Sequence, residues 1–178
     1  MRIKLKQDKN TVLNILKSND IEKKLKLLDR IDGVDSKESI KILMKMLEDQ
    51  SWCMRERAAR KLASYGSRVS SRIERLLKKG YWYTRASACL ALGEIGDLRT
   101  LEPVIRLFLS DENPTVTKEA SGALVKLARK KPAKFADTLR DIDLQPSELR
   151  TVLFALERTD IELYSEIKER VVDERRDI

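Results

Sequence analysis

The chain has 178 residues, of which 37% are charged and 5% aromatic, and its net charge is +8. This length predicts one domain, residues 1–178, and the high charged content suits helices with well-hydrated polar faces. The sequence has no histidine, which excludes Ser-His and Cys-His nucleophile pairs and histidine-ligated zinc or iron. No glycine-rich phosphate loop or other catalytic constellation is present, so we expect no enzyme, no metal site and no cofactor.

The two cysteines, Cys53 and Cys89, form no C-x-x-C pattern, which favours a reducing, cytoplasmic location. Cys89 lies among small apolar residues and is expected to be buried, whereas Cys53 is expected to be the more reactive thiol. No signal-peptide core or long apolar run is present, so we expect neither export nor membrane contact. High Lys, Arg and Glu with little Asn and Gln is also typical of thermophilic proteins.

Residues 1–19 contain a basic lead-in and then a short apolar turn, which predicts an N-terminal cap on a repeat array. A first helical hairpin is expected over about 20–50. Asp20 is a good N-cap for its first helix, Asp32-Gly33 ends that helix, and Ser36 opens the second.

A second hairpin is expected over about 51–80. Its helices are predicted at 52–65 and 68–79 from the spacing of apolar residues. Gly66 and Gly80 follow these two helices and are the predicted stops.

Three more hairpins are expected, at about 81–113, 114–145 and 146–178. Pro103 falls where a helix is predicted, but it can occupy the first turn, where a missing N–H costs nothing. No segment alternates with period 2, so no strand is expected.

The hairpins are internal repeats. A shift of 30 residues places Trp52 on Trp82, Arg55 on Arg85, Ala58 on Ala88, Leu62 on Leu92 and Gly66 on Gly96. A period of this length indicates stacked helical units. The predicted fold is therefore all-α, a right-handed α-solenoid of about five hairpins.

The run Thr84-Arg85-x-x-Ala88-x-x-Ala91-Leu92-Gly93-x-Ile95-Gly96-Asp97 resembles HEAT repeats, most closely the short variety of phycobilisome-lyase-like proteins. The resemblance implies that Arg55, Arg85, Asp97 and Asp111 are structural residues that tie repeats together. It is weaker in the outer repeats, where Thr117 and Leu149 replace the expected arginine and residues 20–50 keep only the apolar spacing.

The resemblance implies a protein-binding scaffold, although the scaffold also carries a few enzymes. The iron-dependent deoxyhypusine hydroxylases require histidine ligands and are excluded here. DNA glycosylases built on HEAT-like repeats use a basic concave surface with tryptophans, and bilin lyases form a further class. Both remain as alternatives at this stage.

The basic charge is concentrated between Ser51 and Arg85, where the sequence has ten cations and only two anions. In the second predicted helix of this hairpin the cations Arg68, Arg72, Arg75 and Lys79 fall on one side. The resemblance places second helices on the concave surface, which makes these four residues a candidate basic groove. Further candidates for the same groove are Arg57, Arg60, Trp52 and Trp82.

We predict a non-enzymatic scaffold that holds an acidic or phosphorylated protein or peptide in this groove. The alternative is a nucleic-acid-binding protein, a class that includes HEAT-type repair glycosylases, in which Trp52 or Trp82 is exposed and stacks on bases. A third hypothesis is a bilin lyase-like protein. Against all three stands the plain interpretation that the cations are a solvated face and that the tryptophans pack between hairpins. A homo-oligomer is compatible with each hypothesis.

Overall fold

The computed structural model describes residues 9–31, 36–78 and 80–172. Within these ranges the chain forms eleven α-helices and no strand, which confirms the all-α prediction. Helix α1 (Lys9–Lys17) comes first. The first helices of the hairpins are α2 (Ile21–Arg30), α4 (Trp52–Ala63), α6 (Trp82–Ile95), α8 (Pro114–Lys130) and α10 (Pro146–Glu157).

The second helices of the hairpins are α3 (Ser36–Met46), α7 (Leu101–Ser110), α9 (Pro132–Asp141) and α11 (Ile161–Val172). In the second hairpin this place is taken by three short pieces, η2 (Gly66–Val69), α5 (Ser70–Glu74) and η3 (Arg75–Leu77). A 3₁₀ turn, η4 (Leu98–Thr100), precedes α7.

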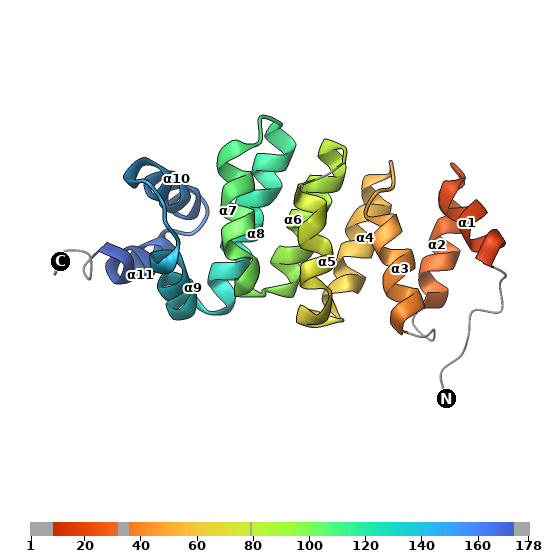
Figure 1. The fold of residues 1–178 in the computed structure, drawn as a ribbon, viewed down its shortest axis with the longest axis horizontal. Helices are drawn as coiled ribbons and strands as arrows, with labels where there is room; N and C mark the ends of the chain where they lie inside the picture. The colour runs from red at the N-terminus through yellow and green to blue at the C-terminus, as the bar shows by residue number, and fades with distance from the viewer. Residues whose placement is uncertain (1–8, 32–35, 79, 173–178) are drawn as a thin grey trace.

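The hairpins follow one another along the long axis of the molecule, with α1 and α11 at opposite ends (Figure 1). Helix α6 packs between α4 and α8, and α9 packs against α11. Each hairpin therefore contacts its neighbours in the sequence, which is the arrangement of an α-solenoid.

One apolar core runs through the stack and includes buried leucines from successive hairpins, such as Leu28, Leu62 and Leu92. Small residues set the distance between α6 and α8. A Cβ atom added to Gly93 would lie 2.9 Å from the Cα of Ala123, so the two backbones are nearly in contact there. The repeated small residues of the sequence therefore allow close helix packing.

The helix ends follow the chemistry of their residues. The side chain of Asp20 accepts a hydrogen bond from the Lys23 N–H and so caps α2, as predicted. Gly96 ends α6 in the left-handed region at φ 74°, a conformation that side chains disfavour. The predicted stop at Asp32-Gly33 lies outside the described residues.

The prediction of one continuous helix over 68–79 is wrong. The segment 66–77 changes from 3₁₀ to α and back to 3₁₀. It starts at Gly66, whose φ of 61° is left-handed, and passes through Ser70 and Ser71. Serine is a weaker helix former than alanine or leucine, so intrinsic propensity holds a helix less strongly at this point.

Candidate functional site

Three of the four predicted groove cations lie on one exposed side of the segment 66–77. Arg68, Arg72 and Arg75 are all exposed, whereas Val69 and Ile73 on the opposite side are fully buried. We call these three arginines the basic ridge. The three arginines stay on one side although the helix is broken, because each 3₁₀ or α piece is only a few residues long and turns the chain little from the direction of a continuous helix. Lys79 lies outside the described residues.

The basic ridge has few internal partners. The Arg68 Nε donates to the Tyr65 carbonyl at 3.4 Å, and its guanidinium carbon lies 5.9 Å from the Tyr65 ring centroid. Neither Arg72 nor Arg75 forms an ion pair with another residue in the described part of the chain. These charges are therefore available to a ligand.

The other two candidate cations lie in the other layer of the solenoid. Arg57 and Arg60 are exposed on the side of α4 that faces away from the core. Arg60 is already paired with Glu56 at 2.8 Å. Because α4 belongs to the layer of first helices and the basic ridge to the layer of second helices, these residues do not join the ridge in one surface.

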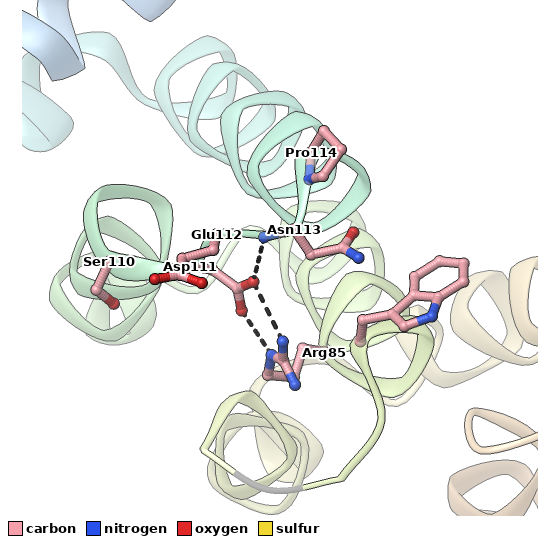
Figure 2. Close-up of a pocket in the computed structure, with 7 residues that line it drawn as sticks. Arg85, Ser110, Asp111, Glu112, Asn113 and Pro114 are labelled. Atoms are coloured by element: carbon pink, nitrogen blue, oxygen red, sulfur yellow. Dashed lines mark hydrogen bonds and ion pairs between the residues drawn. The ribbon is translucent and has the colours of Figure 1, made fainter.

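Arg85 and Asp111 form a clamp within the third hairpin (Figure 2). The Arg85 Nε donates to Asp111 Oδ2 at 2.6 Å and the Nη2 donates to Oδ1 at 3.1 Å. Asp111 also accepts the backbone N–H of Asn113 at 3.0 Å, and Asn113 caps α8. The hydrogen bonds from Arg85 outweigh partial burial and lower the pKa of the Asp111 carboxyl.

A hollow of about 610 Å³ lies beside this clamp, lined by Trp82, Arg85 and residues 110–114 (Figure 2). Its cation is already neutralised by Asp111. The hollow therefore provides little positive charge to bind an anionic ligand. The clamp has a structural role, as the resemblance implied for Arg85 and Asp111.

A second clamp joins Lys24 and Asp49 in the first hairpin, with Nζ 2.5 Å from Oδ2 and both side chains almost buried. Asp49 also accepts the Ser51 N–H at 2.8 Å. Lys24 is the fourth residue of α2 and Arg85 the fourth of α6. Each acid lies three residues before the next first helix. The first hairpin thus keeps more than its apolar spacing, and aligning the helix starts would have revealed this pair in the sequence.

Arg55 occupies the same fourth position in α4 but holds no carboxylate. Its side chain is buried, with the Nη1 donating to the carbonyls of Asp49 at 2.7 Å and Gln50 at 2.8 Å. Its guanidinium carbon lies 5.3 Å from the Trp52 ring and 5.1 Å from the Tyr83 ring. Burial lowers the pKa of the Arg55 guanidinium, and the charge of Asp49 only partly offsets this.

Asp97 orders the turn between α6 and α7. Its carboxylate accepts from the Arg99 backbone N–H at 3.2 Å and from the Arg99 Nη2 at 2.8 Å. Burial opposes ionisation of this carboxyl, but the hydrogen bonds from Arg99 prevail and the pKa of Asp97 lies below its usual value.

The aromatic residues at the starts of α4 and α6 form an exposed cluster. Trp52, Tyr81 and Trp82 are exposed to 40%, 70% and 43%. The Tyr83 ring stacks on Tyr81 with centroids 5.1 Å apart and meets Trp82 edge-on at 5.7 Å. The tryptophans are therefore not buried between hairpins, which contradicts the plain interpretation of their spacing.

The two cysteines differ in their exposure to solvent. Cys89 is buried, as predicted, and burial raises the pKa of its thiol, whereas Cys53 is exposed. Residues 9–31, 36–78 and 80–172 contain no cluster of acids and cysteines able to hold a metal ion. None of the described helices is long and apolar enough to cross a membrane.

A sequence profile of HEAT repeats matches residues 69–157, half of the chain. The chain is a HEAT-repeat protein. The structure is similar to a chain in the complex of CpcE and CpcF of phycocyanin lyase from Nostoc sp. PCC7120. The two share 16% identity and a TM-score of 0.47 over 92% of this chain and 69% of that one. No curated protein matches in sequence. The HEAT resemblance is confirmed, and with it a helical-repeat scaffold.

Proposed function

We propose that this HEAT-repeat protein is a non-enzymatic scaffold that holds an acidic segment of a protein partner on the basic ridge. The observation that carries the proposal is that Arg68, Arg72 and Arg75 are exposed side by side without an acidic partner among the described residues. HEAT repeats serve commonly as protein-binding surfaces because a stack of hairpins presents a long continuous face.

The ridge groups three exposed arginines within residues 68–75. Some exposed arginines elsewhere lie beside acids on the same helix, namely Arg60 with Glu56, Arg106 with Glu102 and Arg170 with Glu166. Such i,i+4 pairs favour the folded chain and leave little charge for a ligand. The ridge has no such internal compensation. Other exposed arginines, such as Arg150, also form no ion pair among the described residues, so the ridge stands out by the number of its charges.

Charge alone gives weak binding. Exposed ion pairs contribute about 0.2–1 kcal/mol each, so three arginines supply at most about 3 kcal/mol. A hollow of about 550 Å³ between η3 and α7 offers apolar contact through Leu77, Pro103 and Leu107, and its lining also includes the Arg106–Glu102 ion pair. An acidic peptide with an apolar side chain near its charges therefore fits this surface best.

The test is to replace Arg68, Arg72 and Arg75 together by Glu and to measure the anisotropy of a fluorescein-labelled acidic peptide with interspersed leucines. The control carries Lys118→Glu, Arg150→Glu and Arg158→Glu, which change the net charge equally at other exposed positions. We expect the ridge variant to lose binding at least tenfold relative to the control. Equal binding by the two variants would refute the proposal.

Nucleic-acid binding is the second candidate, favoured by the exposure of Trp52 and Trp82. Stacking on an exposed aromatic ring contributes about 1–3 kcal/mol per base. The same anisotropy assay with labelled single-stranded DNA and RNA would show a salt slope of about −2 if the three ridge arginines contact phosphates. Trp52→Ala and Trp82→Ala would then weaken binding, whereas a protein scaffold would bind neither nucleic acid.

A further inference from the structure

Among the described residues, the first and third hairpins each contain a clamp and the second contains none. The acid of each clamp lies three residues before the next first helix, at Asp49 and at Asp111. In the second hairpin the corresponding position, 79, is a lysine. A lysine side chain cannot accept hydrogen bonds from a guanidinium, so Arg55 has no acid at the position that supplies the acid of the other two clamps.

Arg55 and Arg85 can be compared donor by donor. Arg85 donates from Nη1 to the Gly80 carbonyl at 3.0 Å, and Arg55 donates from Nη1 to the corresponding Gln50 carbonyl at 2.8 Å. The Nε of Arg85 then donates to the Asp111 carboxylate. The Nε of Arg55 is buried without any hydrogen-bond partner among the described residues. The two guanidinium groups thus share this Nη1 contact, although Arg55 also donates to the Asp49 carbonyl, and only Arg55 lacks a carboxylate at its Nε.

An unpartnered buried N–H on a charged group is costly, and native proteins rarely retain one without a role. The Trp52 and Tyr83 rings against the guanidinium compensate its charge only partly, through cation–π contact. Both rings belong to the exposed aromatic cluster and not to the core. Displacement of these rings by a ligand would therefore leave the core packing intact.

We infer that the Nε edge of Arg55 is a receptor for one carboxylate side chain, an Asp or Glu of a protein partner. The inference rests on the proposed function and names the chemistry that anchors the partner. A carboxylate is favoured over a phosphate because the equivalent edge of Arg85 grips a carboxylate through Nε and Nη2. The surrounding rings would cover the flanking residues of the partner, as aromatic side chains do in the centre of an interface.

The test is to supply the missing acid from the chain itself, with Lys79→Asp. An aspartate at this register should close a third clamp on Arg55, as Asp111 does on Arg85. The control is Lys78→Asp, which changes the charge equally one residue away at an exposed position. We expect Lys79→Asp to raise the thermal midpoint by about 2–4 °C relative to this control. Unchanged or lower midpoints for Lys79→Asp would overturn the inference.

The binding assay uses a fluorescein-labelled octa-aspartate peptide and a phosphoserine peptide of equal length. Lys79→Asp should weaken binding of octa-aspartate at least tenfold relative to Lys78→Asp, because the internal acid competes for Arg55. In a Trp82→Phe background, octa-aspartate should also shift the emission of Trp52 as its ring moves. Arg55→Lys, which keeps the charge but removes the fork, should abolish this shift.

The outcomes separate the two proposals. Binding that is lost in the ridge variant but is equal in Lys79→Asp and Lys78→Asp would overturn the Arg55 receptor and leave the proposed function standing. Wild-type binding of the phosphoserine peptide but not of octa-aspartate would overturn the assignment to a carboxylate. Failure of the wild-type protein to bind either peptide at low salt would overturn both proposals.

Discussion

Replacing Asp111 by Asn tests the clamp between α6 and the turn before α8. The substitution keeps the size of the side chain, but it removes the counter-ion of Arg85 and replaces one of the two acceptor oxygens by an NH₂ donor. The Asp111 side chain is 6% exposed and that of Arg85 is 24% exposed. The pair is therefore largely, though not fully, shielded from water.

Breaking a fully buried pair costs about 3–5 kcal/mol, and an exposed pair contributes about 1 kcal/mol or less. With Arg85 a quarter exposed, we expect Asp111→Asn to lower the free energy of unfolding by about 2 kcal/mol. For a chain of this size that corresponds to a fall in midpoint of about 4–8 °C. Glu56→Gln, which removes the exposed partner of Arg60, should cost about 0.5 kcal/mol or less.

The pH dependence of the free energy of unfolding tests whether the ionised Asp111 carboxylate causes this loss of stability. The hydrogen bonds from Arg85 lower the folded pKa of Asp111 below 3.8. The stability from this ionisation is therefore complete above the unfolded pKa and is lost as the pH falls through the folded pKa. Urea unfolding at pH 7 and at steps below about pH 5 should show the difference between wild type and Asp111→Asn shrinking. A difference that stays constant, or a loss no larger than that of Glu56→Gln, would refute the reasoning.

Two further predictions concern packing and thiol reactivity. Gly93→Ala should destabilise the protein by about 1–3 kcal/mol, because its Cβ would meet the backbone of α8 at 2.9 Å, whereas Gly122→Ala, with open space around it, should stabilise by about 0.5–1 kcal/mol. Urea unfolding measures both, and equal effects would contradict the close approach. At pH 8 a thiol reagent should label Cys53 quickly and the buried Cys89 only after unfolding. Two fast thiols would contradict that burial.

The sequence was informative about the hairpins because their signals are local. Apolar spacing, the Asp20 cap and the Gly66 turn each act within a few residues, so helix positions follow from short windows. The exception is the segment 66–77, where apolar spacing fits both α and 3₁₀ turns. Periodicity cannot separate them there, because the competition is decided by local hydrogen bonding.

The binding residues were harder to predict, because a sequence shows charge but not pairing. Arg55 and Arg85 look equivalent at a spacing of 30 residues. One holds a carboxylate 26 residues further along the chain, and the other holds none. Likewise, the cations of α4 and the basic ridge are close in sequence but lie in different layers.

The sequence by itself determined that this protein is an all-α stack of HEAT repeats with its basic charge in the second hairpin, because repeat spacing and composition are properties of the chain. Only the tertiary structure decided which charges are already neutralised. Ion pairs such as Lys24 with Asp49 join residues from different helices, and their distances and burial exist only once the hairpins are packed. That packing leaves the basic ridge and the Nε of Arg55 without acidic partners among the described residues.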